Sequence, residues 1–237
     1  MSGTVLALDT SHMKGSVAVS AGGTIAGEVL FDASDTHSAT MMPAVDACLG
    51  IAGVSISEID LFAVVTGPGS FTGLRIGLAT VKGFASFRKR PVVPLGSLEL
   101  LAAALPFTAG PVMPLIDARR GEVYAAVYDT SGGSPVVLSP PGAVEPSRAG
   151  ELPGGVPVIA CGTGSIRYRE ELVRSLPRGS LFAGERWSVP SAGLAAVLAA
   201  EMEPVPYESL HLIEPVYIRP PDAKLPPETR LGRGGAG

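Results

Sequence analysis

The chain has 237 residues, of which 46% are hydrophobic and 17% are charged, and its formal net charge is −4. This apolar content can build the core of one large domain or two small ones, which excludes disorder of the whole chain. The acidic balance argues against a stand-alone nucleic-acid-binding protein, because phosphate binding depends on a concentrated positive field.

Neither a membrane span nor a targeting peptide is predicted. The longest uncharged run, Leu100 to Ile116, contains three prolines and is too short to cross a bilayer. The first eight residues carry no basic side chain, unlike a signal peptide. Cys48 and Cys161 match neither a disulfide framework nor a zinc pattern. We therefore expect a cytoplasmic protein whose two thiols are buried.

The first part of the chain predicts three strands, a helix and a βαβ unit. Alternating apolar runs predict a β-meander, and a later spacing of three and four predicts a helix that ends at Gly53. A strand, a glycine-rich turn, a helix and another strand then imply parallel pairing. The strands are expected at 4–9, 16–20, 24–31, 61–66 and 91–95, and the helices at 37–52 and 72–87.

The second half repeats the opening in outline. An apolar run at 112–117 ends in Asp117, and a polar loop leads to a second apolar run at 121–127, as in residues 5–9 and 15–19. Apolar hairpins are common, so chance is the alternative to an internal duplication, which we favour. A strand at 156–161, helices at 166–176 and 191–203, and a disordered Pro- and Gly-rich tail complete the expected order.

Two lobes that each open with such a hairpin suggest an α/β fold of the actin, hexokinase and Hsp70 type (ASKHA, ribonuclease H-like). We expect an N-terminal lobe at 1–107, a short C-terminal lobe at 108–219 and the tail at 220–237. In that fold the hairpin loops face the phosphates of a nucleotide in the cleft between the lobes.

The loop of Asp9, Thr10 and Ser11 is the first candidate for nucleotide binding. Backbone N–H groups and hydroxyls can hold phosphate, and a carboxylate can organise a metal ion or water. The alternative is a side-chain turn that only closes the hairpin.

Residues 66–77 (TGPGSFTGLRIG) are the most distinctive stretch. Gly67 and Gly69 would allow close backbone approach to a phosphate at the start of a helix, although neither standard phosphate fingerprint is present. The alternative is a packing helix, since Gly73 and Gly77 lie on one helical face and would admit another helix.

No self-sufficient active site is predicted. The three histidines form no H-x-x-x-H or H-E-x-x-H motif, and C-x-x-C and G-x-S-x-G are also missing from the sequence. We therefore assign no catalytic residue, no metal ligand and no cofactor. The helix at 37–52 is apolar around most of its circumference, so it is either a core helix or, beside the glycine-rich helix, half of a surface for a partner's helices.

Five motifs together resemble the TsaB (YeaZ) family. They are LALDTS at 6–11, HS at 37–38, GPGSFTGLRIG at 67–77, DARRGEVY at 117–124 and EPVYIR at 214–219. The resemblance implies a role in forming N6-threonylcarbamoyladenosine at position 37 of tRNAs that read ANN codons. It implies a non-catalytic scaffold that binds and activates the paralogue TsaD, which carries the metal and transfers the threonylcarbamoyl group, and helps recruit the ATPase TsaE.

Two departures from TsaD agree with that division of labour. Where TsaD-like proteins have a metal-binding H-x-x-x-H, this chain has Ser97 and Leu101, and the glycine-rich loop of active relatives is replaced by residues 118–121 (ARRG). The second departure argues against nucleotide binding in the cleft, so the site would be vestigial. Neither supports a peptidase.

The resemblance also implies that the helices at 37–52 and 72–87 pack against TsaD, or against a second copy in a homodimer. Candidate contact positions are Met41, Met42, Val45, Leu74, Arg75 and Leu78. The tRNA would be reached only through the complex, without a membrane partner. The competing hypotheses are an ATP-dependent small-molecule kinase or transferase that acts through Asp9 and the glycine turn, and a metalloprotease.

Overall fold

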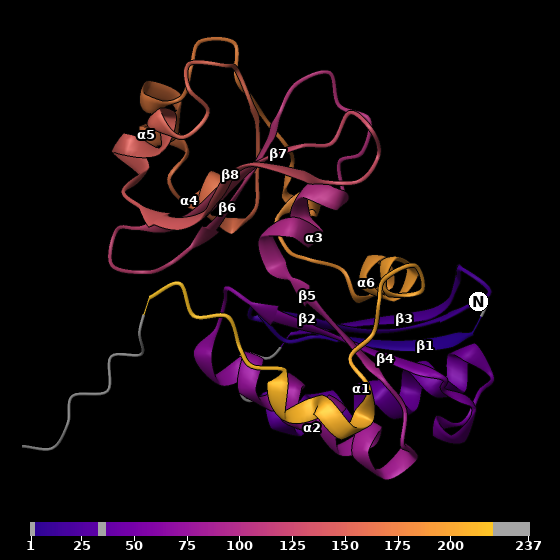
Figure 1. Cartoon of the computed structure of the whole chain (residues 1–237). Helices are drawn as coiled ribbons and strands as arrows, with labels where there is room; N and C mark the ends of the chain where they lie inside the picture. The colour runs from indigo at the N-terminus through magenta and orange to yellow at the C-terminus, as the bar shows by residue number, and fades with distance from the viewer. Residues whose placement is uncertain (1–2, 33–36, 220–237) are drawn as a thin grey trace, which may run out of the picture.

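Each half of the chain contributes a five-stranded mixed sheet to one of two lobes (Figure 1). The computed structural model describes residues 3–32 and 37–219, so the expected tail at 220–237 lies outside the described residues. Among the described residues, no helix has the length and apolar character needed to cross a membrane. Both cysteines are buried and unpaired with each other, as expected.

The first sheet has β1 at its centre. Strands β1, β2 and β3 form the predicted antiparallel meander, whereas β4 and β5 run parallel to β1, in the order β3-β2-β1-β4-β5. Their bounds are Thr4–Asp9, Lys14–Ala21, Thr24–Asp32, Leu61–Gly67 and Val92–Gly96.

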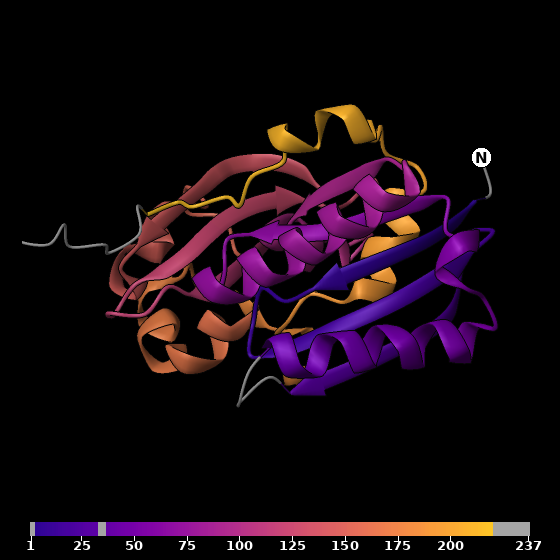
Figure 2. The same cartoon turned by 90° about the horizontal axis from the view of Figure 1, so that it is seen from below.

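Helices cover both faces of this sheet because its inner strands are apolar on both sides. Helices α1 (His37–Ala52) and α2 (Phe71–Arg88) lie side by side on one face, where Leu6 and Leu8 point (Figure 2). Helix α6 (Ala192–Ala199) packs on Ala7 and its neighbours on the other face through four alanines. The chain therefore returns to the first lobe within the segment that the sequence assigned to the second.

The second sheet repeats the strand order of the first. Its order β8-β7-β6-β9-β10 corresponds to β3-β2-β1-β4-β5, with β9 and β10 reduced to three and two residues. The strands are Val112–Asp117, Val123–Asp129, Val136–Val144, Ile159–Cys161 and Leu181–Phe182. This confirms the predicted two-lobed α/β fold with a short second lobe.

The remaining helices are short. Helix α3 (Ser97–Ala103) lies between the lobes, and the helix predicted at 166–176 is divided at Tyr168 into α4 (Thr163–Arg167) and α5 (Arg169–Ser175). The helix predicted to run to residue 203 ends at Ala199. The 3-10 helices are Ile56–Glu58, Pro146–Glu151, Glu185–Trp187 and Tyr207–Leu212.

The last described segment, residues 213–219, ties the lobes together, and we call it the strap. Ile213 is buried in the first lobe, and the Val216 N–H donates to the Thr66 carbonyl over 2.8 Å. Ile218 packs against the core of the second lobe, and Arg219 forms an ion pair with Glu122 over 2.6 Å. The strap is therefore anchored to both lobes.

Candidate functional site: the cleft between the lobes

A cleft of about 810 Å³ lies between the lobes. Its walls come from the β1–β2 loop, the start of α2, the β6–β7 loop and the strap. The polar and aromatic lining residues include Ser11, His12, Lys14, Ser70, Phe71, Asp117, Arg119, Tyr124, Tyr217 and Arg219. This is the place where the fold was expected to hold a nucleotide.

The β1–β2 loop is fixed by its own hydrogen bonds. The Ser11 N–H donates to Asp9 Oδ1 over 2.8 Å, which is the side-chain turn that the sequence left as an alternative. Asp9 is completely buried, and burial raises its pKa to about 6. Thr10 is also buried, and its hydroxyl donates to the Gly73 carbonyl over 2.8 Å. Of these three predicted residues, only Ser11 lines the cleft.

His12 follows in the same loop and faces a low-polarity environment. Its Nδ1 lies 2.7 Å from Ser11 Oγ, whereas Nε2 has no hydrogen-bond partner among the described residues. Burial lowers the pKa of His12 to about 4, so the imidazole is neutral near pH 7.

The glycines of the 67–77 motif bring α2 close to this loop. A Cβ on Gly69 would lie 2.3 Å from the Ser11 carbonyl oxygen, and one on Gly77 would lie 2.2 Å from Thr10 Oγ1. The glycine face of α2 therefore admits the β1–β2 loop, and the alternative that it admits another helix is wrong for Gly77. Gly67, with φ of 118°, lies behind the cleft against the strap, whereas Gly69 lines it.

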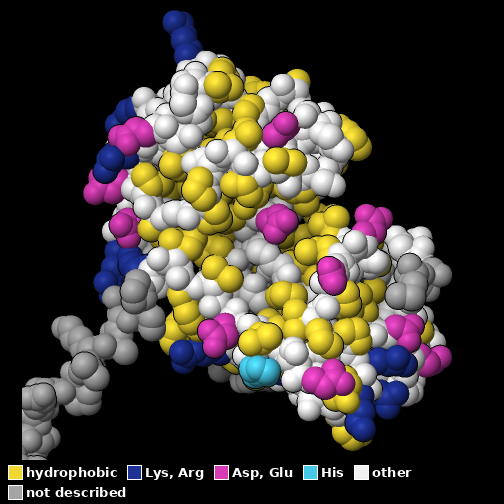
Figure 3. All heavy atoms as spheres, in the orientation of Figure 1, with side chains coloured by type: hydrophobic (Ala, Val, Ile, Leu, Met, Phe, Trp, Pro, Cys, Tyr) yellow, Lys and Arg dark blue, Asp and Glu magenta, His cyan; other side chains and the backbone are white. Residues whose placement is uncertain are grey.

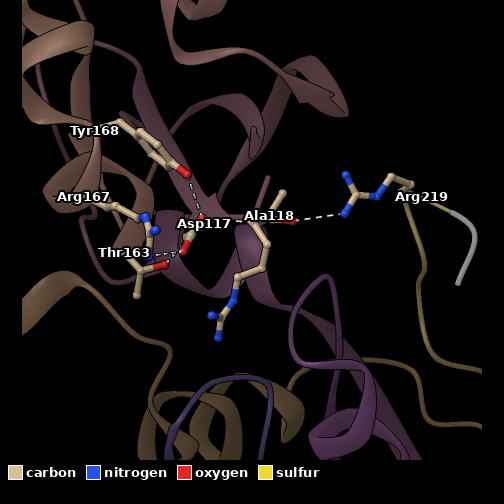
Figure 4. Close-up of polar contacts among 7 residues, drawn as sticks. Asp117, Ala118, Thr163, Arg167, Tyr168 and Arg219 are labelled. Atoms are coloured by element: carbon tan, nitrogen blue, oxygen red, sulfur yellow. Dashed lines mark hydrogen bonds and ion pairs between the residues drawn. The ribbon is translucent and has the colours of Figure 1, made fainter. Parts of the chain in front are cut away.

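In the second lobe, the Asp117 carboxylate is hydrogen-bonded and ion-paired to neighbouring residues (Figure 4). Its Oδ1 accepts hydrogen bonds from the Arg119 N–H over 2.9 Å and the Tyr168 hydroxyl over 3.2 Å. Its Oδ2 forms an ion pair with Arg167 over 3.2 Å. These contacts satisfy the carboxylate, so it has a structural role at the end of β6.

The β6–β7 turn carries basic side chains on a left-handed backbone. Arg119, Arg120 and Gly121 have φ values of 63°, 56° and 79°. Such a conformation is unusual for side chains larger than glycine and often marks functional loops. Arg119 lines the cleft, as do Lys14 and Arg219. Sequence reasoning did not single out these three cations as site residues.

A groove of about 380 Å³ continues from the cleft between α2 and the strap. Tyr217 lines both hollows, and its ring centroid is 5.2 Å from that of Phe71. The Arg75 guanidinium lies 3.8 Å from the centre of the Phe71 ring, and Arg75 Nε donates to the Tyr217 hydroxyl over 3.0 Å. These three side chains form a stack at the junction of the cleft and the groove.

Comparison with known proteins places this architecture in a family. The family model described as "TsaD: tRNA N6-adenosine threonylcarbamoyltransferase" matches residues 26–224. The structure of YeaZ from Pseudomonas aeruginosa is 31% identical, with a TM-score of 0.77 over 91% of this chain and 99% of that one. The chain belongs to the TsaB (YeaZ) family.

Curated relatives carry the name "tRNA threonylcarbamoyladenosine biosynthesis protein TsaB". The Bacillus subtilis protein is 35% identical over 55% of this chain and 57% of its own length. The Haemophilus influenzae protein is 38% identical over 51% of this chain and 52% of its own length. The matched part of the chain thus spans about half the length of these curated relatives.

The two sequence positions compared above with a metal-binding motif, Ser97 and Leu101, are buried. Leu101 packs in the core of the second lobe, and Ser97 is completely buried. Among the described residues, no group of three His, Cys, Asp or Glu side chains could hold a metal ion.

The predicted partner-contact positions of the TsaB-like helices fall into a buried and an exposed group. Met41, Val45 and Leu74 are at most 2% exposed, so they support the first lobe from within and cannot touch a partner without rearrangement. Leu78 is also buried, and it lines the groove. Met42 and Arg75 are exposed.

Three exposed apolar residues on these helices, Ile51, Phe71 and Phe87, were not among the predicted contact positions. Ile51 near the end of α1 and Phe87 near the end of α2 are 63% and 82% exposed. Because an α1 that is apolar on all sides gives no preferred face, the sequence alone could not separate core positions from surface positions.

Proposed function

We propose that this chain is a non-catalytic subunit of the complex that forms N6-threonylcarbamoyladenosine at position 37 of tRNAs reading ANN codons. It binds and activates a TsaD-like paralogue and helps recruit a TsaE-like ATPase. The names of the curated relatives support the pathway. This role puts the chain in the cytoplasm with its tRNA substrate.

The non-catalytic role is inferred from one observation, which is that the candidate catalytic groups are buried or already bonded to other residues of the chain. Asp9 is buried in a turn, Asp117 is held by Arg167 and Tyr168, and Leu101 occupies a core position in place of a metal ligand. These groups stabilise the two lobes, and a partner must then supply the chemistry.

The exposed apolar side chains of α1 and α2 support a docking role for this helix pair. Met42 on α1 and Phe87 on α2 are 41% and 82% exposed, respectively, and burying them against a partner would be favourable. In the absence of the paralogue, the same face would pair two copies of this chain.

Reconstitution tests the proposal directly. Modified nucleoside is measured on tRNA with TsaD, TsaE, ATP and threonylcarbamoyl-adenylate, with and without this chain. We expect product only when the chain is added, and none from the chain alone. Product that forms equally well without the chain would disprove the activating role.

A negative charge introduced at Met42 on α1 tests whether the helix pair is the docking surface. Met42→Glu should abolish co-elution with the TsaD-like partner at micromolar concentration and leave the fold intact. Val173→Glu is the matched control, because Val173 is a 60% exposed apolar residue on α5 of the other lobe. Co-elution that survives Met42→Glu would exclude this part of the surface.

The second candidate function is an ATP-dependent small-molecule kinase or transferase, which the volume of the cleft favours. Of the residues predicted for its nucleotide site, Ser11 and Gly69 line the cleft, whereas Asp9, Thr10 and Gly67 do not. ATP binding by the isolated chain that weakens in Ser11→Ala would support it, and the absence of ATP binding at millimolar nucleotide would exclude it.

A further inference from the structure

Basic side chains gather along the cleft and the adjoining groove although the whole chain is acidic. Acidic lining residues are limited to Asp117 and Glu214. We call the basic lining residues the basic seam, and they are Lys14, Arg75, Lys82, Arg119 and Arg219. Figure 3 shows Lys and Arg side chains, with Asp and Glu side chains between them, on both lobes at the edge of the molecule where the grey trace begins.

Most of this positive charge is not neutralised within the protein. In the described part of the chain, Lys14, Lys82 and Arg119 have no carboxylate within ion-pair distance. Asp117, the acidic residue of the cleft, is already paired with Arg167. The field that faces the cleft and groove is therefore positive and suited to a polyanion.

Aromatic rings lie among these cations. Phe71 is 38% exposed, and Tyr217 is shared by the cleft and the groove. Unpaired bases of RNA stack on aromatic rings and on arginine planes, whereas a phosphate group alone or an acidic peptide has no need of them. The start of α2 adds the partial positive charge of a helix N-terminus next to Phe71.

We propose that the basic seam binds a single-stranded segment of RNA, with phosphates at Lys14, Arg119 and Lys82 and a base against Tyr217, whose ring is held in place by Phe71 and Arg75. The inference rests on the proposed function, which makes tRNA the relevant RNA. It departs from the expectation that tRNA is reached only through the partners, because this chain would contribute contacts of its own.

Salt dependence of binding gives the first test. Fluorescence anisotropy of a labelled anticodon stem–loop is measured with the full chain between 50 and 200 mM salt. Three phosphate contacts to a single strand give a log–log slope of about −2, which corresponds to about 20-fold weaker binding across this range. No detectable binding at 50 mM salt would overturn the inference.

Charge removal at the seam gives the second test. Lys14→Gln with Arg119→Gln should reduce the magnitude of the slope by about 1.4, since two phosphate contacts are lost. Arg174→Gln with Arg178→Gln is the matched control, because these exposed arginines line neither hollow and the net charge changes equally. Equal slopes for the two double variants would contradict the proposal.

The aromatic contact is tested by replacing Tyr217. Tyr217→Ala should weaken RNA binding by about 5-fold or more, because a stacked base is lost, whereas Tyr217→Phe retains the ring and should bind nearly as the natural chain does. A poly-glutamate peptide that displaces RNA at equal charge concentration, together with full binding by Tyr217→Ala, would point to an acidic protein partner and overturn the RNA assignment.

The two proposals can fail separately. If the seam double variant binds RNA with an unchanged slope and still supports nucleoside formation by the complex, the RNA inference fails and the scaffold function stands. If the double variant loses RNA binding but the natural chain does not stimulate modification, the RNA site stands and the scaffold function fails.

Discussion

The two hairpin loops that face the cleft occupy equivalent places in the two lobes, yet they differ in burial and in charge. In the first lobe the β1–β2 loop is buried, with Thr10 bonded to α2 and the Ser11 carbonyl accepting from the Ser70 N–H over 2.7 Å. In the second lobe the β6–β7 turn is exposed and carries Arg119 and Arg120.

The same strand topology therefore forms one wall of the cleft from a buried loop and the other from an exposed turn that carries arginines. The first loop is bonded to α2 and its N-terminus through Thr10 and Ser11, and the second turn presents Arg119 to the cleft. A buried loop is sensitive to pH and to added volume, whereas an exposed turn tolerates both better.

The largest expected effect concerns the two buried titratable groups of the first loop. Burial raises the pKa of Asp9 from 3.8 to about 6, so folded Asp9 holds its proton more tightly and stability falls as pH rises between these values. Burial lowers the pKa of His12 from 6.5 to about 4, so stability rises with pH across nearly the same window. Each contribution is about 3 kcal/mol, and the two oppose each other.

Single substitutions should expose these opposed contributions. In Asp9→Asn, which keeps the turn acceptor, the free energy of unfolding should rise relative to the natural chain by about 3 kcal/mol between pH 4 and 6.5. In His12→Gln it should fall by a similar amount. Urea unfolding across this range measures both, and variants whose curves run parallel to that of the natural chain would show that neither group is buried as described.

The next effect concerns added volume at Gly69, which packs on the first loop, and at Gly121, which lies in the second turn. Gly69→Ala would place its Cβ 2.3 Å from the Ser11 carbonyl, and the required backbone shift should cost about 2–3 kcal/mol. Gly121→Ala has open space, so it should cost about 1 kcal/mol, from the left-handed φ of 79° alone.

Urea denaturation separates the two substitutions, with Gly50→Ala in α1 as the control. That glycine has nothing within 4 Å and lies inside a helix, so alanine should stabilise the protein by about 0.5–1 kcal/mol. Equal costs at Gly69 and Gly121 would argue against the tight contact between α2 and the first loop.

The five strands and the two long helices of the first lobe could be predicted from the sequence, whereas α3 and the packing of α6 could not. Its strands at 4–9 and 24–31 and its helix at 37–52 agree with β1, β3 and α1, because each element is apolar on the side that it buries. Strand β8 of the second lobe was missed because most of its side chains are exposed and it contains Pro140 and Pro141, so no alternation marks it.

The candidate site could be predicted in part. Ser11 and Gly69 were found because hydroxyls and glycines near a helix start suggest an anion site. Arg219 and Lys14 were missed because their place in the cleft depends on long-range packing of the strap and of the two lobes. The packing of α6 on the first sheet was missed for the same reason, since its alanines give no directional signal.

The smallest effect concerns the ion pair that fastens the strap to the exposed turn. Arg219 and Glu122 are 29% and 34% exposed, and Arg219 also donates to the Ala118 carbonyl over 3.3 Å. We expect Arg219→Met to lower the free energy of unfolding by about 1 kcal/mol and to speed hydrogen exchange in the β6–β7 turn.

Arg148→Met supplies the matched comparison for that substitution. Its ion pair with Glu151 has both side chains 64% exposed and joins residues three apart, so its loss should lower the free energy of unfolding less than the loss of Arg219 does. A cost at Arg148 equal to that at Arg219, with unchanged exchange in the β6–β7 turn, would mean that the strap adds nothing beyond an ordinary surface pair. A larger cost at Arg219 would establish the strap as the element that joins the exposed turn of the second lobe to the first lobe.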